Sequence, residues 1–380
     1  MAVKSLRDRL WDTFSHTSIN RIVYSPRIYY WYLGNNLLVK KPDKYLKGPV
    51  PDRFIGKTQL EIYDMLDASP RYAEETLYLP ILSTKIKPEA GIHIRSKRGS
   101  KKGETITVYS TPLGVLTETK AIGGGLGAHY IEFPVKSIED IPIMKYILDN
   151  TEFQFNQENF EEAEQLLGSR GIASLYVFST PYQRLIKTIM GFTRTTVLLK
   201  RKPNEMIDFM AYMEEWDDKM YNLVEKSPVR IVNFGENIDA NLSPPPIFEK
   251  YLLPYYEKRV KQLRNVGIVT HIHIDGSFKQ LLPYFEKLPF DGLEALTCDP
   301  QGDVTIDELS QYIGDKILLD GVPSILFLPQ YSLEYVENYT RKVLETFSPN
   351  LILGVSDELS PNGDITKLER IRDIVNNFEP

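Results

Sequence analysis

Seven apolar, β-branched runs without polar alternation recur along the chain, and they predict its main architecture. The stretches between most of them show helical periodicity. Strands that lack polar alternation and are separated by helices are typical of a parallel sheet covered on both faces. The seven runs lie at 21–28, 172–179, 230–238, 268–276, 292–297, 317–322 and 351–356.

The order of strands and helices favours one α/β architecture. A (β/α)8 TIM-type barrel is favoured over an open doubly wound sheet, because no dinucleotide fingerprint is present and an eighth strand is easy to overlook. Residues 1–380 are therefore expected to form a single barrel domain. The predicted helices lie at 58–66, opened by a Thr58/Glu61 capping pattern, and at 137–149, 157–168, 203–226, 245–266, 305–313, 332–347 and 364–378.

Residues 83–135 follow a different pattern, with strand-like alternation and turn residues at Gly99 and Gly103. This pattern predicts an antiparallel β-rich insertion near the N-terminus of the barrel. A glycine-rich loop within it is followed by a strand-like run rather than a helix start, which favours a mobile lid over a phosphate-binding loop. The glycines of that loop are Gly123, Gly124, Gly125 and Gly127.

Charge and composition narrow the classes of function. The chain has 42% hydrophobic residues, 25% charged residues and a formal net charge of −6, so a nucleic-acid-binding protein is not expected. A single cysteine, Cys298, excludes an internal disulfide and indicates a reducing compartment. The charged and amphipathic N-terminal stretch MAVKSLRDRLWDTF is not expected to act as a secretory signal, and the sequence has no apolar run of some 18 residues. The expectation is a cytoplasmic protein that binds neither membrane nor nucleic acid.

The run IVTHIHIDG carries two of the five histidines, His271 and His273. Residues two apart in a strand point to the same side, so both imidazoles face one environment. One interpretation is a catalytic metal site. The alternative is a pair of core histidines that hydrogen-bond to neighbouring hydroxyls or carboxylates.

The barrel hypothesis places further polar residues near this pair, because active sites of such barrels lie at the carboxyl ends of the strands. A His-x-His pair with one or two carboxylates is a reasonable zinc site with an open position. Asp357 ranks first as the third ligand, followed by Glu294 and Cys298. The strand-end residues are Arg27, Glu236, Asn237, Asp239, His271, His273, Asp275, Glu294, Cys298, Asp299, Asp320, Ser356, Asp357 and Glu358.

The first apolar run ends in four consecutive aromatic residues, 29–32. Flat rings with polar groups suit a cavity for an apolar or aromatic ligand. On this interpretation Tyr29, Tyr30 and Trp31 hold the ring of a substrate. A packed edge against the following helices explains the same pattern equally well.

The region from about residue 230 to the C-terminus resembles the uroporphyrinogen decarboxylase superfamily. The resemblance is carried by ENIDANLSPPPIFEKYLLPYYEKRV, THIHIDG, DGLEALTCDPQGDVTIDELSQYIGDKILLDGVP and LILGVSDELSP, and weakly by RIVYSPRIYYW. The superfamily implies a (β/α)8 barrel. It includes the decarboxylase and zinc-dependent methyltransferases that transfer methyl groups to or from corrinoid proteins or coenzyme thiols.

Departures from the superfamily patterns favour the methyltransferase branch. The arginine-rich stretch of the decarboxylases is reduced here to SPRIYYW with Arg27, which is poor in cations for a polycarboxylate. In the methyltransferases the zinc ligands are a His-x-Cys pair and a later Cys. The similar positions here hold His271, His273 and Asp357. Such a nitrogen and oxygen site suits an oxygen-containing substrate better than a thiol.

The resemblance implies a metal-dependent methyltransferase, with Zn²⁺ as Lewis acid, that moves a methyl group from an O-methyl compound to a corrinoid protein. The small-molecule methyl donor is expected to be a methoxylated aromatic compound. Glu236 or Glu294 would position or protonate the leaving oxygen, and Arg27 and Asn237 would contact the substrate. The cobalamin must come with a partner, because the chain has no corrinoid-binding Asp-x-His-x-x-Gly motif. The alternatives are a metal-free decarboxylase acting on a smaller carboxylate and a non-enzymatic ligand-binding barrel.

Overall fold

The computed structural model describes residues 4–17, 21–35, 37, 48–123 and 127–380. These residues belong to two compact units. Unit 1 comprises Met1–Ile81, Gln157–Val177 and Pro228–Pro380, and unit 2 comprises Leu82–Asn156 and Phe178–Ser227. No helix in the described part of the chain is long and apolar enough to cross a membrane.

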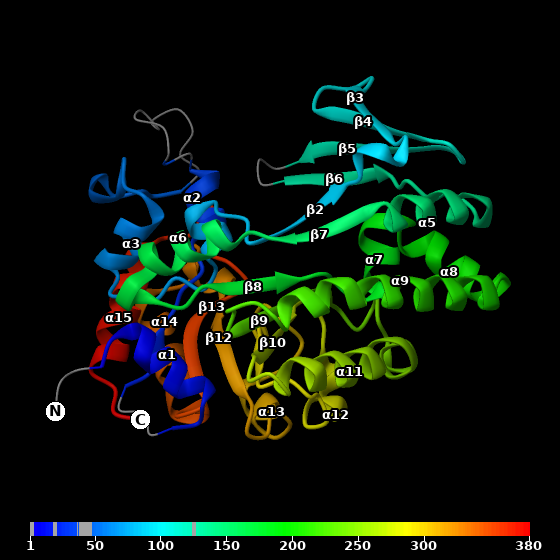
Figure 1. The fold of residues 1–380 in the computed structure, drawn as a ribbon. Helices are drawn as coiled ribbons and strands as arrows, with labels where there is room; N and C mark the ends of the chain where they lie inside the picture. Colours follow the sequence, from blue (N-terminus) through cyan, green and yellow to red (C-terminus); the bar gives the residue numbers. More distant parts are fainter. Residues whose placement is uncertain (1–3, 18–20, 36, 38–47, 124–126) are drawn as a thin grey trace. The chain divides into compact units, whose positions relative to one another are not determined.

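Unit 1 is built on a curled, parallel, TIM-like sheet (Figure 1). Its strands pair in the order β1-β13-β12-β11-β10-β9-β8, and every neighbouring pair is parallel. Each strand coincides with one of the seven apolar runs of the sequence. The strands are β1 (Val23–Tyr24), β8 (Ser174–Val177), β9 (Ile231–Ile238), β10 (Val269–Ile274), β11 (Gly292–Glu294), β12 (Ile317–Pro323) and β13 (Leu351–Ser356).

The segment 69–72 lies beside both edge strands of this sheet without forming a regular strand. The Ser69 amide donates to the carbonyl of Tyr24 in β1 at 2.8 Å, and the Ser174 hydroxyl of β8 donates to the Arg71 carbonyl at 2.7 Å. Pro70 between them has no N–H to give to a ladder. The segment thus takes the place of an eighth strand and brings Arg71 to the sheet.

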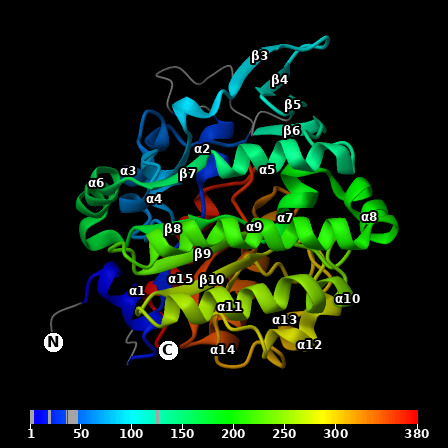
Figure 2. The ribbon, with the colours of Figure 1, turned by 45° about the vertical axis from the view of Figure 1, so that its right-hand side comes forward.

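Helices of unit 1 cover the outer face of the sheet: α11 contacts β10, α14 contacts β12 and β13, and α15 contacts β1 (Figure 2). Helix α1 packs Leu10 and Phe14 against strand residues such as Leu319 and Ile352. The helices are α1 (Leu6–Phe14), α2 (Tyr29–Gly34), α3 (Gln59–Met65), α4 (Ala73–Leu77), α6 (Gln157–Leu167), α10 (Pro245–Ile247), α11 (Leu253–Arg264), α12 (Leu282–Phe285), α13 (Ile306–Ser310), α14 (Leu333–Phe347) and α15 (Thr366–Asn376).

Unit 2 combines antiparallel strands with four α-helices in its described residues. One sheet has the order β3-β4-β5-β6, and a separate ribbon pairs β2 with β7. The strands are β2 (Leu82–Ile86), β3 (His93–Arg98), β4 (Glu104–Thr111), β5 (Gly114–Gly123), β6 (Gly127–Glu132) and β7 (Thr151–Phe155). The helices are α5 (Ile141–Asp149), α7 (Pro181–Arg184) with the π-helical turn η5 (Leu185–Ile189), α8 (Phe192–Arg201) and α9 (Pro203–Val224).

The predicted α/β class, the TIM-like parallel sheet and the antiparallel insertion are confirmed. The capping box of Thr58 and Glu61 also opens α3 as predicted. Unit 2 extends beyond the predicted insertion at 83–135, because residues 178–227 belong to it as well. The proposed lid glycines Gly124 and Gly125 lie outside the described residues, and the lid stays a prediction.

Candidate functional site

Strand register places polar side chains next to one another on the concave side of the sheet in unit 1. His271 of β10 is the register partner of Asn233 in β9, and His273 is the partner of Glu294 in β11. Since side chains alternate along a strand, His271 and His273 share a face with both partners. All four residues are buried.

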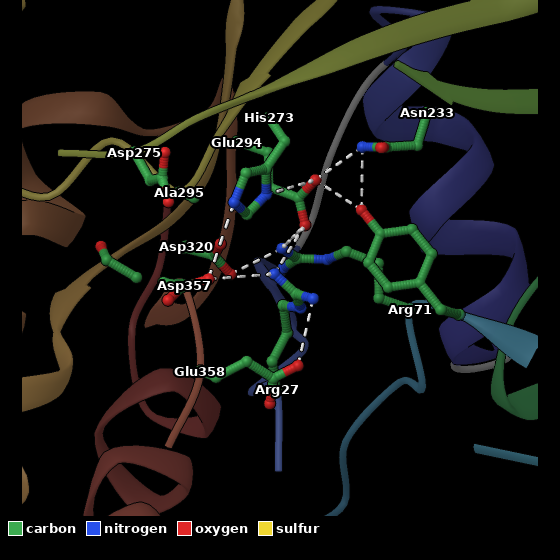
Figure 3. A network of polar contacts seen from close by, with 12 residues as sticks. Arg27, Arg71, Asn233, His273, Asp275, Glu294, Ala295, Asp320, Asp357 and Glu358 are labelled. Carbon is green, nitrogen blue, oxygen red and sulfur yellow. Dashed lines mark hydrogen bonds and ion pairs between the residues drawn. The ribbon is translucent and has the colours of Figure 1, made fainter. Parts of the chain in front are cut away.

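Glu294 lies at the centre of this network, with its side chain fully buried. Figure 3 shows its carboxylate between the His273 ring and the guanidinium groups of Arg27 and Arg71. Asn233 Nδ2 donates to Glu294 Oε2 at 2.6 Å, and the Tyr72 hydroxyl donates a short hydrogen bond to the same oxygen. The carboxylate is therefore held by neighbours from four separate segments of the chain.

Two buried arginines join Glu294 to further carboxylates. Arg71 NH1 lies 3.1 Å from Glu294 Oε1 and 2.6 Å from Asp320 Oδ1, and its NH2 donates to the Ser25 carbonyl. Arg27 lies within 4 Å of four carboxylates: Glu75 at 3.4 Å, Glu294 at 3.6 Å, Asp357 at 3.8 Å and Glu358 at 3.1 Å. Two guanidinium groups thus face five carboxylates, an excess of three negative charges when all are ionised.

Burial and these neighbours move the pKa values in opposite directions. Burial opposes ionisation of Glu294, but Arg27 and the other neighbours of the carboxylate outweigh it and hold the pKa of Glu294 well below its usual range. Burial raises the pKa of Glu358 to about 8 and that of Asp320 to about 6, although an arginine beside each acts against the shift. The cluster therefore relieves part of its excess negative charge by binding protons.

Three residues other than glycine adopt positive φ angles in the region of the polar network: Asp320 within β12, Ala295 directly after β11 and Asp357 directly after β13. The φ angles are 64° at Ala295, 95° at Asp320 and 64° at Asp357. Leu319 lies on the same side of the sheet as Arg71 and His271. Regular alternation would turn the next residue, Asp320, to the opposite side, yet its carboxylate accepts a hydrogen bond from Arg71. Such strained backbone is costly and is concentrated at functional sites. The strain thus supports this region as the functional site.

The pKa values of the two histidines shift in opposite directions because their surroundings differ. Burial lowers the pKa of His271, whose Nδ1 lies 2.9 Å from the Asn233 amide nitrogen. Since that amide also donates to Glu294, we assign Nδ1 of His271 as an acceptor. Burial would also lower the pKa of His273, but Glu294 raises it above its ordinary value. Asp357 Oδ1 lies 3.6 Å from the Nε2 atom of His273 on the other side of the ring.

Two histidine nitrogens lie near one carboxylate oxygen at distances close to those between ligands of a zinc ion. His271 Nδ1 lies 3.4 Å and His273 Nδ1 lies 3.6 Å from the same atom, Glu294 Oε2. Two tetrahedral ligands, each about 2.0–2.1 Å from zinc, are separated by about 3.4 Å. As the side chains stand, no group of three or more His, Cys, Asp or Glu residues in the described ranges is arranged to hold a metal ion.

The Asn233 amide explains part of this difference. Its Nδ2 atom is within hydrogen-bonding distance of both His271 Nδ1 and Glu294 Oε2, and so blocks their lone pairs. Each histidine Nδ1 atom is separated from Glu294 Oε2 by about the distance between two zinc ligands, but the amide stands between His271 and Glu294. The metal ligands predicted from the sequence, His271, His273 and Asp357, stay a prediction.

The aromatic residues predicted to hold a substrate fall into two groups. Tyr29 contacts the rings of Tyr30 and Tyr78, and the Tyr30 amide donates to Glu358 at 3.3 Å. Tyr30 is 38% exposed and Tyr78 is 46% exposed. Trp31 is instead fully buried, packs on Phe54 and donates from its indole nitrogen to the Gly363 carbonyl.

We expect Trp31→Ala to lower the free energy of unfolding by about 3–5 kcal/mol, because the change empties a fully buried position. Tyr30→Ala is the control, and it should cost less than about 1 kcal/mol because this side chain is partly exposed. Urea unfolding measures both. Equal stability of the two variants would contradict the core position of Trp31.

The remaining predicted site residues are placed as follows. Glu236 is fully buried in β9. Asn237 is exposed and donates to Asp275 at 3.2 Å. Cys298 is buried, and burial raises the pKa of its thiol to about 12. A thiol with so high a pKa is a poor candidate for a thiolate ligand.

Sequence reasoning missed several members of the network: Arg71, Tyr72, Glu75, Tyr176 and Asn233. Tyr72 stacks on Tyr176 at 4.3 Å between ring centroids, and the Tyr176 hydroxyl donates to Glu75 at 2.9 Å. One signal was available in the sequence. Asn233 is a polar residue inside an apolar run, and it needs a partner there.

The comparisons with known proteins agree with this fold. Residues 114–378 match the uroporphyrinogen decarboxylase (URO-D) family, and the chain belongs to that family. The comparison with curated proteins gives no match.

Two solved structures illustrate the structural likeness. A methyltransferase from Methanosarcina mazei is 12% identical, covers 98% of this chain and 100% of its own, and superposes with a TM-score of 0.61. A B12-independent methionine synthase from Shewanella sp. W3-18-1 is 11% identical, covers 94% of this chain and 96% of its own, and has a TM-score of 0.42. The first likeness shows a shared fold, and the second is too weak to support an argument.

Proposed function

We propose that the protein is a metal-dependent methyltransferase that moves a methyl group from a methoxylated aromatic compound to a corrinoid carried by a partner protein. The observation that supports the proposal most is the approach of two histidine Nδ1 atoms to one carboxylate oxygen of Glu294. Membership of the URO-D family and a fold shared with a methyltransferase are consistent with it.

His271, His273 and Glu294 are the metal ligands in this proposal. Asp357, which ranked first from the sequence, takes a different role because it lies on the Nε2 side of His273, away from Glu294. At 3.6 Å it is too far for a hydrogen bond, but its charge favours a proton on Nε2. With that proton on Nε2, Nδ1 would be free to bind a metal ion held between it and Glu294. A carboxylate that orients a ligating histidine in this way is common around metals.

A bound divalent metal would supply Lewis acidity to the ether oxygen of the substrate. The protein residues prepare its site. Arg27 and Arg71 keep Glu294 ionised, Tyr72 and Asn233 fix the orientation of its carboxylate, and burial keeps His271 neutral. For methyl transfer the O–CH3 bond would break with the oxygen keeping the bonding pair and taking a proton from solvent, and a reduced corrinoid on the partner protein would supply the electron pair for the new bond to the methyl carbon. The products are a phenol and a methylated corrinoid protein.

The substrate ring is assigned to the partly exposed tyrosines, Tyr29, Tyr30 and Tyr78. The Tyr30 amide donates to Glu358, which contacts Arg27 of the network. Tyrosine rings bind aromatic molecules by stacking and edge contacts. Trp31 is left out of this site because its indole is buried in the core.

The arrangement of Arg27 argues against a decarboxylase acting on a smaller acid. That reaction needs a cation that is free to bind a substrate carboxylate. Four carboxylates already lie within 4 Å of the Arg27 guanidinium, and Arg71 is paired with two. A further anion would be repelled here.

Two measurements test the proposal. The first is the metal content of the purified protein, and the second is methyl transfer from 1,2-dimethoxybenzene to a purified corrinoid protein. We expect one zinc per chain, lost with activity in His271→Ala. In Asp357→Ala, zinc affinity should fall by about 10–100-fold, as for other residues that orient metal ligands. Cys298→Ser is the control and should keep metal and activity. Methyl transfer without any bound metal, or full zinc content in His271→Ala, would refute the assignment.

A further inference from the structure

A cavity of about 250 Å³ is lined only by residues of unit 2, none of which belongs to the polar network described above. One wall is the β4-β5-β6 sheet, with Tyr109, Glu118 and Tyr130. The other walls come from α5, α7, η5 and α9. A dry cavity of about 150 Å³ is enough for benzene, so this one has room for a substituted ring.

Two buried hydrogen-bond donors in the wall of this cavity lack acceptors. Trp216 is 5% exposed and Arg184 is 8% exposed. The Trp216 Nε1 atom and the Arg184 Nε atom have no hydrogen-bond partner among the described residues. A buried donor without an acceptor is costly and calls for an explanation. An acceptor atom on a bound molecule would provide it.

The charged groups of the cavity are already paired within the protein. Arg184 NH2 lies 2.7 Å from Asp217 Oδ2, and Asp217 is fully buried. On the sheet, Glu118 lies 3.0 Å from Lys120 Nζ, and this ammonium also lies 4.4 Å from the centroid of the Tyr130 ring. A ligand with its own charge would therefore be buried without a counter-ion, which is unfavourable.

Apolar side chains complete the wall between the two ion pairs. Met144 and Ile147 of α5 and Met213 of α9 line the cavity with the indole of Trp216. Methionine is adaptable and makes favourable contacts with aromatic rings. The wall therefore suits the flat face of a ring better than a polar chain.

From the unpaired donors, the internal charge pairing and the aromatic and methionine wall, we propose that unit 2 binds a small uncharged aromatic molecule that carries an oxygen acceptor. The acceptor would bond to Trp216 Nε1 and Arg184 Nε, and the ring would lie against Met144 and Met213. This binding site is independent of the methyl-transfer site proposed in unit 1.

Isothermal titration calorimetry of the full-length chain with three probe molecules tests the proposal. Acetophenone has a ring and an uncharged carbonyl acceptor, ethylbenzene lacks the acceptor, and benzoate carries a charge. We expect acetophenone to bind, and each of the others to bind at least about fivefold more weakly. Equal affinity for acetophenone and ethylbenzene, a preference for benzoate, or no binding of acetophenone would overturn the proposal.

Two substitutions locate the binding in the cavity. Met144→Trp should fill it and weaken acetophenone binding by about tenfold or more, whereas Leu113→Trp, at a position 57% exposed, should leave binding unchanged. Trp216→Phe removes one donor and should weaken acetophenone but not ethylbenzene. Trp216→Phe tests the site even if Met144→Trp does not fold. An equal loss of affinity for acetophenone and ethylbenzene would contradict the role of the indole as a hydrogen-bond donor.

His271→Ala separates this proposal from the methyltransferase proposal. Acetophenone binding should be the same in this variant as in the wild-type chain, whether or not metal and methyl transfer are lost. Binding that disappears with His271→Ala would place the ligand in unit 1 and refute the site in unit 2.

Discussion

Glu294→Gln is expected to remove metal binding and methyl transfer together, and to lower the free energy of unfolding by about 3–5 kcal/mol. Glutamine has nearly the same shape, so the change removes a charge rather than volume. Arg27 and Arg71 would both lose a buried carboxylate within 4 Å. The Tyr72 hydroxyl and the Asn233 amide would lose an ionised acceptor as well.

Zinc analysis, methyl-transfer rates and urea unfolding measure these effects. Methyl transfer should fall by more than about 100-fold, beyond the loss expected for a residue that only orients a ligand. Glu369→Gln is the matched control, because this carboxylate pairs with Arg53 at the surface and should contribute less than about 1 kcal/mol. Retention of zinc in Glu294→Gln, with loss of stability alone, would show a purely structural role.

The strands could be predicted because parallel strands buried on both faces appear in the sequence as continuous apolar runs. The eighth position of the barrel could not be predicted in the same way. Residues 68–72 read ASPRY, which is a turn pattern, and Pro70 prevents a regular ladder. Only the tertiary hydrogen bonds from Ser69 and Ser174 show that this segment lies beside the sheet. Arg71 was missed for that reason.

The histidine pair and its neighbourhood were more accessible to sequence reasoning. Strand alternation predicts that His271 and His273 face the same side, and the register brings them to Asn233 and Glu294 as partners. Which carboxylate lies on which nitrogen of His273 depends on side-chain rotamers and on the positive φ of Asp357. The sequence carries no signal for the rotamers or for this φ angle, so the prediction placed Asp357 above Glu294.

The aromatic run shows a different limit. Consecutive residues in a helix are turned by about 100° from one another, so α2 cannot direct four neighbouring rings into one cavity. Tyr30 is partly exposed while Trp31 is enclosed. The sequence could not decide between these positions without the helix boundaries and the packing of Phe54 on the indole.

Arg71→Met is expected to be among the most destabilising single changes in unit 1, at about 3–5 kcal/mol. Methionine fills much of the arginine volume, but Asp320 is fully buried and would lose the guanidinium 2.6 Å away. Urea unfolding of chelator-treated protein measures the effect. Arg53→Met, which breaks an exposed pair with Glu369, is the control and should cost less than about 1 kcal/mol.

The loss in Arg71→Met should depend on pH, and the direction follows from Asp320. Burial already raises the pKa of Asp320 to about 6, and Arg71 acts against this shift, so removing the arginine raises the pKa further. A carboxyl with a folded pKa above its unfolded value of about 3.9 makes the folded state less stable as pH rises through that range. The deficit of Arg71→Met should therefore be smaller at pH 5 than at pH 7.5.

The double variant Arg71→Met, Asp320→Asn should recover stability at pH 7.5, by about 0.5–3 kcal/mol relative to additive losses. A pH-independent deficit, or strictly additive losses, would show that the charge of Asp320 is not what Arg71 stabilises.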